Sequence, residues 1–448
     1  AAGSVNGTPP VPGPGGNRLI RDVESKISIV GGLETWAAQA TPVSAEQDRV
    51  YDQLPVTRAF GVVVICKFKR TASGISYPLA LVTSQTPSWA HTHVEAGFYD
   101  DSPNSRLVVI YNATQGPTIT SLGADIDYLL AIELRAAGAF WKIKGGEFTN
   151  WMTLFAHTLG STATLYVASA GYTAVFTLDD VRLPARKFQD APLASDDFAG
   201  GAGSIDARLT NGLGHPEANG GAGLAWTGAT WTVDGAGAAV NTPTLGAELA
   251  SGNLVVGTWY SITATTANYF YTGNAVGDTF RATATTALDA THKVKAITLS
   301  TLFSSLVLSI PNVQMDCVIK TLIAGTQAGF VARLDDATTP TKGIIGIWDG
   351  AGSIKVDEFT TATTWTNLLN TVKAYATGDK LVPWLNGSAW RLYHFTAAGL
   401  VTLLGSGTTN VLTGNLFGNF STYSGNKIES CVVHAVGTEN QYGAMDSL

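Results

Sequence analysis

The sequence predicts an all-β protein, and three observations lead to that class. Short runs rich in β-branched and aromatic residues recur along the chain, and Gly, Pro, Asn, Asp or Ser bounds each run. Glycine is abundant, with 49 residues, while charged residues make up only 14% of the 448. Sustained helical periodicity is missing, and the best helix candidate is a short connector at 45–54. Many short strands joined by tight turns give such a composition.

The strands follow one another closely after a segment of a different kind. Residues 1–17 contain Pro, Gly and small side chains without apolar periodicity, so we expect an extended arm that contacts a neighbouring subunit, or else a frayed end. The predicted strands of the first half are 25–32, 61–70, 77–84, 92–101, 105–113, 128–136, 139–146, 162–169 and 174–184.

Segments of the first half recur in the same order in the second half. "VICKFKR" (64–70) matches "MDCVIKT" (315–321), and "AGFYDD" (96–101) matches "IGIWDG" (345–350). The chain is therefore interpreted as a tandem duplication of one β domain.

A third match concerns a hairpin. "LRAAGAFWKIKGG" (134–146) runs strand, glycine, strand with Trp141, and "AYATGDKLVPWLNG" (374–387) repeats this order with Trp384. A glycine-rich loop for an anion would be followed by a helix, and none follows here. The stretch predicts a hairpin whose second strand carries an aromatic side chain into a core.

Each half has the pattern of a two-sheet jelly roll. The strand order, the hairpin in mid-domain and the closing strand "FTLDDVRL" (176–183) resemble the concanavalin A-like family, including LamG-type lectin and glucanase domains. The resemblance covers most of residues 18–190 and, with an interruption, 196–440. It implies two tandem jelly-roll sandwiches.

The interruption of the second half has strand alternation of its own, in "WYSITAT", "DTFRATA" and "HKVKAITL". It predicts a small inserted β module whose removal leaves the second sandwich folded, and it resembles β modules of structural proteins of tailed bacteriophages. An overgrown loop is the alternative, although unstructured loops of that length are uncommon. The predicted domains are an arm at 1–17, a sandwich at 18–190, a second sandwich at 196–242 plus 304–440, and the insert at 243–303.

One cluster has the residue types of a metal site. Alternation places His91, His93 and Glu95 on one strand face, with Val94 and Ala96 on the other. Imidazole and carboxylate ligands suit Zn²⁺ or another transition metal. The alternative is the solvated face of an antiparallel strand.

The resemblance to LamG-type domains implies a second kind of metal site, a Ca²⁺ ion at the rim of a sandwich. Asp100, Asp101, Asp335 and Asp349 are the candidate ligands. Aspartates at these positions also form turns, which is the alternative interpretation. The prediction is therefore no cofactor, with Ca²⁺ left open.

A glycan site would need aromatic side chains for stacking and polar neighbours for the hydroxyl groups. Tryptophans near predicted turns are Trp89, Trp151, Trp226, Trp231, Trp365 and Trp390. Trp89, Trp151, Trp365 and Trp390 are the candidates for glycan contacts, although tryptophan in a sandwich is more often part of the core.

The composition argues against several partners. The net charge is -7 without a basic cluster, so nucleic acid is not expected. The longest apolar run, 59–66, is too short to cross a bilayer, so no membrane insertion is expected. Cys66, Cys317 and Cys431 form no framework; a Cys317–Cys431 disulfide stays open, but buried thiols are favoured.

The paired carboxylates of the glucanase branch, E-x-D-x-x-E, do not occur, so an enzyme is not predicted. The leading hypothesis is a structural or adhesive protein of a phage virion or of another extracellular appendage. We expect it to assemble with copies of itself and with other virion or surface-appendage proteins, and a cell-surface glycan is a further expected ligand. A lectin-like carbohydrate-binding module is the alternative, and a glycoside hydrolase or lyase ranks third.

Overall fold

The computed structural model describes residues 3–4, 18–21, 27–30, 33–37, 49–52, 63–83, 94–104, 106–120, 122–134, 138–158, 165–171, 173–182, 192–210, 223–308, 310–397 and 401–436. In these ranges the chain forms antiparallel strands and two short 3₁₀ turns, η3 (Ser102–Asn104) and η5 (Leu299–Leu302). No helix within them has the length and apolar character of a membrane span. The predicted all-β class is confirmed.

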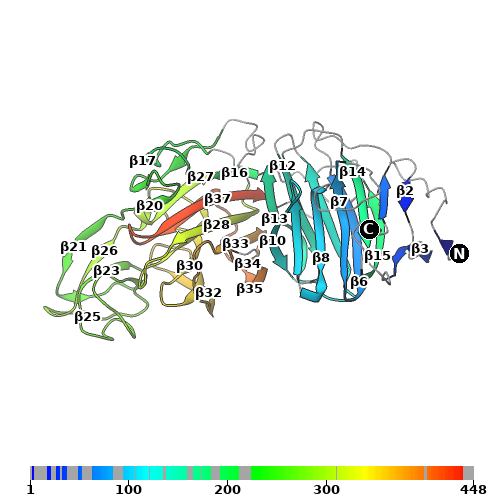
Figure 1. Cartoon of the computed structure of the whole chain (residues 1–448). Coiled ribbons are helices and arrows are strands. Elements are labelled where there is room, and N and C mark those ends of the chain that lie inside the picture. Colours follow the sequence, from blue (N-terminus) through cyan, green and yellow to red (C-terminus); the bar gives the residue numbers. More distant parts are fainter. Residues whose placement is uncertain are drawn as a thin grey trace.

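The first sandwich consists of two sheets (Figure 1). Sheet 1 has the strand order β1 (Gly3–Ser4), β3 (Ile27–Val30), β4 (Leu33–Trp36), β15 (Val175–Arg182), β6 (Val63–Ala72), β11 (Tyr128–Leu134), β12 (Gly138–Gly145) and β13 (Phe148–Thr158). Sheet 2 has the order β10 (Thr114–Thr120), β9 (Arg106–Tyr111), β8 (Val94–Asp101), β7 (Ile75–Val82), β14 (Tyr166–Gly171), β5 (Arg49–Asp52) and β2 (Arg18–Arg21).

The second sandwich also has two sheets. Sheet 3 has the order β17 (Gly203–Ser204), β19 (Trp231–Val233), β20 (Ala239–Asn241), β37 (Lys427–Ala435), β28 (Val313–Thr321), β33 (Lys380–Asn386), β34 (Ala389–Phe395) and β35 (Val401–Thr408), and β16 (Pro192–Asp196) also pairs with β37. Sheet 4 has the order β18 (Trp226–Thr227), β27 (Phe303–Val307), β36 (Leu416–Ser421), β29 (Ala328–Leu334), β30 (Gly343–Trp348), β31 (Ser353–Phe359) and β32 (Trp365–Val372).

The two sandwiches share one topology. The run β15-β6-β11-β12-β13 of sheet 1 corresponds to β37-β28-β33-β34-β35 of sheet 3, and β14-β7-β8-β9-β10 of sheet 2 corresponds to β36-β29-β30-β31-β32 of sheet 4. This order confirms the predicted duplication and the tandem jelly rolls. The matches of β6 with β28 and of β8 with β30 agree with it.

The third sequence match is wrong by one strand. Trp141 lies on β12, whereas Trp384 lies on β33, whose counterpart is β11. Successive strands of this meander repeat the same pattern of turn, strand and glycine, so the wrong pair can be matched. The hairpin itself is confirmed, because β11 pairs with β12 from Tyr128 opposite Gly145 to Leu134 opposite Ala139.

Two further sequence predictions, a helix at 45–54 and an arm at 1–17, can be compared with the structure near the N-terminus. The helix candidate at 45–54 is wrong at its centre, because Arg49–Asp52 form β5 between β14 and β2. Val50 and Tyr51 favour strands, and two neighbouring strands satisfy their backbone groups. Of the predicted arm, Gly3–Ser4 pair with β3 of the same chain, and the rest of 1–17 lies outside the described residues.

Alternating side chains fill the core between the sheets of each sandwich. In the second sandwich β28 directs Met315, Cys317 and Ile319 inward, against Phe330 and Trp348 of sheet 4. Cys317 lies directly opposite Cys431 of β37, and both are buried free thiols rather than a disulfide. Burial raises the pKa of both thiols, as expected for cysteines that act as core residues.

The sandwiches pack against each other through the outer face of sheet 3. Val382 and Trp384 of β33 and Tyr393 of β34 join the apolar core of the first sandwich. The Gln314 side chain accepts a hydrogen bond from the Thr153 N–H (3.2 Å) and donates one to the Thr153 carbonyl oxygen (3.0 Å). The paired amide groups satisfy one another where water is excluded.

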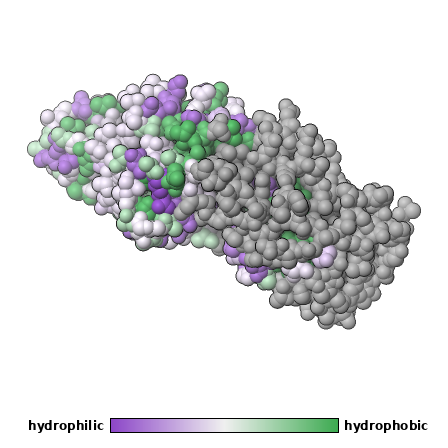
Figure 2. All heavy atoms as spheres, turned by 90° about the horizontal axis from the view of Figure 1, so that it is seen from above, coloured by the Kyte–Doolittle hydropathy of each residue, from purple (hydrophilic) through white to green (hydrophobic). Residues whose placement is uncertain are grey.

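The insert lies at the end of the molecule away from β1 (Figure 1). Its main sheet, sheet 5, has the order β21 (Leu245–Leu249), β26 (Lys293–Ile297), β23 (Trp259–Ala264) and β24 (Thr279–Arg281), and β22 (Gly252–Asn253) pairs with β25 (Ala287–Leu288). From above, the surface of this end is a mosaic of hydrophilic and hydrophobic residues (Figure 2).

Candidate functional site

The insert docks on the outer face of sheet 4. Trp259 of β23 packs against Phe420 of β36, with ring centroids 5.2 Å apart. Polar contacts flank this aromatic pair: the Thr279 hydroxyl donates to Gln327 Oε1 (2.7 Å), and Gln327 Nε2 donates to the Thr279 carbonyl oxygen (2.7 Å). The insert is therefore joined to the sandwich by shared apolar and polar contacts, and not only by its two chain connections.

A cavity of about 510 Å³ lies beside this joint, and both parts line it. The insert contributes the aromatic residues Trp259, Phe270, Tyr271 and Phe280. Phe270 and Tyr271 pack against Phe280 with centroids 5.3 and 5.7 Å away. The volume is that of a pocket for a small ligand or for one or two sugar residues.

Tyr271 is fixed by more than packing. Its hydroxyl donates a hydrogen bond of 2.8 Å to Asp278 Oδ2, and Asp278 also accepts from the N–H of Ala275. Burial and the Asp278 carboxylate raise the pKa of Tyr271, so the phenol stays neutral. The insert thus offers a rigid, uncharged aromatic wall.

Sheet 4 contributes the polar wall, because β31 and β32 pair so that polar residues stand opposite one another. Asp357 faces Asn367, and Lys355 faces Asn370. Asn367 Nδ2 donates to Asp357 Oδ1 over 2.7 Å. Strand alternation places Lys355 and Asp357 on the outer face, while Val356 between them enters the core.

Two ion pairs neutralise the charges around the cavity. Arg281 of β24 contacts Asp357 at 2.6 Å, which also ties the insert to sheet 4. Lys355 contacts Asp349 at 2.9 Å. The guanidinium of Arg281 lies over the ring of Trp365, 4.5 Å from its centroid. A cation on an aromatic face is electrostatically favourable, so this stack fixes the Arg281 side chain.

The predicted glycan-contact tryptophans have different positions. Trp365 lies next to the cavity but beneath Arg281, where it also stacks on Phe359 (4.5 Å). Trp151 and Trp390 are buried, with 9% and 4% of their surface exposed, and so take part in apolar packing. Trp226 and Trp231, the other two tryptophans near predicted turns, also belong to the core. Trp89 lies outside the described residues.

The predicted metal cluster is described only at Glu95, because His91 and His93 lie outside the described residues. Glu95 is buried on β8. The predicted face pattern is wrong there: Leu81 pairs with Ala96 and Val82 with Val94, so the register shifts at Glu95. Such a bulge places Val94 and Ala96 in different apolar clusters, on opposite faces of the sheet.

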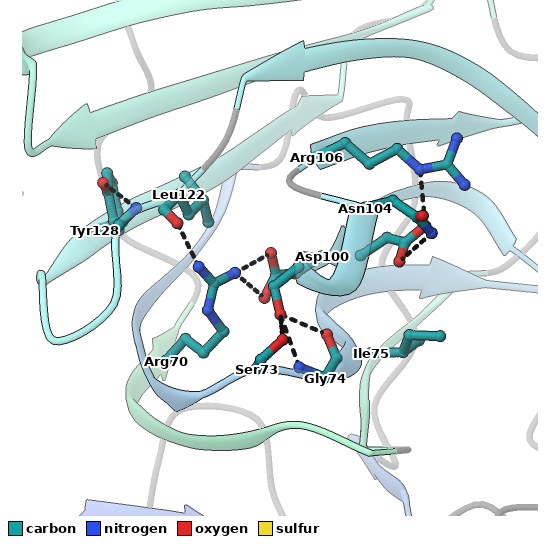
Figure 3. Close-up of polar contacts among 12 residues, drawn as sticks. Arg70, Ser73, Gly74, Ile75, Asp100, Asn104, Arg106, Leu122 and Tyr128 are labelled. Carbon is teal, nitrogen blue, oxygen red and sulfur yellow. Dashed lines mark hydrogen bonds and ion pairs between the residues drawn. The ribbon is translucent and has the colours of Figure 1, made fainter.

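The first two calcium candidates each have an arginine partner (Figure 3): Asp100 of sheet 2 pairs with Arg70 of sheet 1, and Asp101 pairs with Arg106 of the neighbouring strand β9. Asp100 accepts two hydrogen bonds from Arg70 Nη1 (2.8 and 3.0 Å), and Arg70 also donates to the Leu122 carbonyl oxygen. Burial raises the pKa of Asp100 to about 6, against the opposing effect of Arg70. Asp101 pairs with Arg106 at 2.7 Å.

The other two calcium candidates shape turns. Asp335 accepts hydrogen bonds from the N–H groups of Thr341 and Lys342, and Asp349 accepts from those of Ala351 and Ser353. No group of three metal-ligating side chains occurs within the ranges that the structure describes. These contacts are what the turn-forming interpretation predicts.

Several cavity residues escaped the sequence analysis. The aromatic run "NYFYTG" (268–273) and the alternation of Lys355, Asp357 and Phe359 are both visible in the sequence. Neither pattern predicts that an insert strand lies against β31, because that contact joins segments far apart in the chain. Of the predicted glycan-contact tryptophans that the structure describes, only Trp365 lies next to this cavity.

Comparisons with known proteins do not show a family for this chain. No family model matches the chain, and no curated protein matches it. Among solved structures, the carbohydrate-binding module CBM66 from Bacillus subtilis shares 14% identity at a TM-score of 0.22, over 30% of this chain and 78% of that one. The exoplasmic/lumenal domain of VIP36, bound to Ca²⁺ and mannose, shares 12% at 0.26, over 38% and 86%.

The seed lectin of Lotus tetragonolobus shares 9% identity at a TM-score of 0.25, over 38% of this chain and 94% of that one. With TM-scores this low, these neighbours carry no argument about this chain, and its fold is established by its own strand order.

Proposed function

We propose that this chain is a non-enzymatic, glycan-binding adhesive protein whose ligand occupies the cavity between the insert and sheet 4. The observation that carries the proposal is the chemistry of the two walls. Phe270, Tyr271 and Phe280 offer aromatic faces, and Asp357 and Asn367 offer hydrogen-bonding groups. A sugar ring has a C–H face that stacks on aromatic rings and hydroxyl groups that bond to carboxylates and amides, so it matches both walls.

The place of the cavity supports an adhesive role. Its lining comes from the insert and from sheet 4. The insert strands β21, β23 and β26 lie at the end of the molecule opposite the one marked N (Figure 1). A protein attached through its N-terminal part would present the cavity outward. The narrower proposal is a component of a phage virion or other extracellular appendage, working in several copies. The mass of the assembled particle, measured by light scattering, tests that narrower proposal separately.

Glycan binding can be tested with a substitution that fills the cavity without altering its polar groups. Ala351 is an exposed cavity residue two positions after Asp349, in a turn that this aspartate forms. The substitution Ala351→Trp should lower affinity for any array-selected oligosaccharide at least about ten-fold. Ala236→Trp is the matched control, because Ala236 is exposed and follows Asp234 in a similar turn outside the cavity.

Three results would contradict the proposal. The first is an array of neutral and acidic oligosaccharides on which the intact protein binds nothing. The second is equal binding by the Ala351→Trp and Ala236→Trp variants. The third concerns the non-enzymatic part: bound oligosaccharides that are cleaved on prolonged incubation, as seen by chromatography, would make the chain an enzyme.

A further inference from the structure

We propose that Asp349 determines the charge selectivity of the cavity: by neutralising Lys355 it makes the site select neutral sugar residues over acidic ones. This inference rests on the proposed function and names the class of ligand for the same site. Asp349 does not need to touch the ligand to have this effect. The supporting observation is that the charged residues around the cavity form ion pairs.

The cavity contains charges of both signs in equal number. Arg281 and Lys355 are the cations, and Asp349 and Asp357 are the anions. Each cation contacts one anion, at 2.6 Å for Arg281 with Asp357 and 2.9 Å for Lys355 with Asp349. The lining is therefore electrically neutral, pair by pair.

The two cations differ in how a ligand would meet them. The side chain of Arg281 is 14% exposed and lies between Asp357 and the ring of Trp365. Lys355 is 36% exposed, which makes it the cation that an incoming ligand would meet. Asp349 is the carboxylate that holds it, so Asp349 decides whether this ammonium group attracts an anion.

An acidic sugar would bring another carboxylate to a site lined by Asp349 and Asp357, with the Asp278 carboxylate bonded to Tyr271 of the same lining. It would either compete with Asp349 for Lys355 or lie close to like charges, and both effects oppose binding. Hydroxyl groups carry no such cost, because they can donate to the Asp357 carboxylate and accept from the Lys355 ammonium group or the asparagine amides. The geometry thus favours neutral sugars such as hexoses over uronic acids.

The chain contains a matched control for this pair. Asp349 Oδ1 accepts hydrogen bonds from the N–H groups two and four positions ahead, and its Oδ2 contacts Lys355. Asp234 repeats this arrangement: Oδ1 accepts from Ala236 and Ala238, and Oδ2 contacts Lys427 at 2.8 Å. Asp234 does not line the cavity. In either position, asparagine keeps a carbonyl oxygen for the turn and removes one negative charge.

The experiment compares matched ligands on the full chain. Cellohexaose, mannohexaose and galactohexaose are each paired with the derivative whose C6 groups are oxidised to carboxylates, and binding is measured by calorimetry in 50 mM and 500 mM NaCl. The intact protein should prefer the neutral member. Asp349→Asn should raise affinity for the acidic member about five-fold at low salt, lose this gain at high salt, and leave the neutral member within about two-fold.

Each contrary outcome has its own meaning. Tighter binding of acidic ligands by the intact protein would overturn the inference and leave glycan binding standing. Equal gains in Asp349→Asn and Asp234→Asn would assign the effect to the net charge of the chain and would also overturn it. Binding of none of the six ligands, with none selected from the array, would refute the proposed function and this inference with it.

Discussion

The two sandwiches have the same strand order, but they use the corresponding outer strands differently. In sheet 2, β9 presents Val108 and Ile110 to an apolar cluster on the outer face. In sheet 4, β31 stands at the same place in the order and presents Lys355 and Asp357 beside the insert. A duplicated scaffold has thus acquired a candidate site through two changes together, an inserted module and polar residues on the strand beside it.

The largest expected effect comes from removing the insert. The outer face of sheet 4 buries Phe303, Phe359 and Phe420 in a cluster with Trp259 and Ile297 of the insert. Replacing 245–298 by a short Gly-Ser linker should destabilise the second sandwich by about 5 kcal/mol or more, because each phenylalanine becomes exposed to water. Calorimetry should show the transition of the second sandwich at a lower temperature, with that of the first unchanged.

This outcome differs from the expectation drawn from sequence, in which the second sandwich stays folded without the insert. Linker variants of different lengths control for strain at the junction. If the second sandwich keeps its melting temperature with every linker, the insert contributes no stability, and the apolar contacts described above are incidental.

A smaller effect is expected from breaking the ion pair that ties the insert to sheet 4. Asp357→Ala leaves the Arg281 guanidinium, which is largely buried, without its carboxylate, and should cost about 3 kcal/mol of unfolding free energy. The double variant Arg281→Met with Asp357→Leu should be milder than the single one, because no unpaired charge remains. Urea denaturation measures both, and a double variant worse than Asp357→Ala would contradict this account.

The smallest effect concerns the first sandwich and depends on pH. Burial raises the pKa of Asp100 from 3.8 to about 6, so the folded protein holds a proton that the unfolded chain releases between these values. This contribution is complete below pH 3.8 and is lost as the pH rises through about 6. The stability of the intact protein relative to Asp100→Asn should therefore fall by roughly 2 kcal/mol between pH 3.5 and 7.

Urea titrations of both proteins at several pH values measure this difference. The Asp335→Asn variant, altered at a turn aspartate whose pKa is lowered instead, should show the opposite slope. A difference between the intact protein and Asp100→Asn that does not change with pH would mean that the pKa of Asp100 is the same in the folded and the unfolded protein.

The sequence predicted the fold well, because strand alternation and turn residues are local signals. It failed where the result depends on pairing between distant segments. Val50 and Tyr51 belong to a strand only because β14 and β2 lie beside them. The register shift at Glu95 depends on β7, and the neighbouring hairpins look alike until their partners are known.

The candidate site shows the same limit more strongly. Trp365 is an aromatic residue near a predicted turn, and it does lie close to the cavity, beneath Arg281. The polar wall formed by Asp357 and Asn367 arises from the pairing of two strands, and the aromatic wall comes from an insert folded onto them. No local pattern in the sequence contains that combination.

The two ends of the insert lie side by side, which has an evolutionary consequence. Leu245 pairs with Ile297, and the Thr298 N–H donates to the Thr244 carbonyl oxygen over 3.0 Å. Modules of other lengths can therefore replace this one in a lineage without moving the strands on either side. The apolar outer face is a stronger constraint than the junction: homologues that have lost the module should carry polar residues where this chain has Phe359 and Phe420.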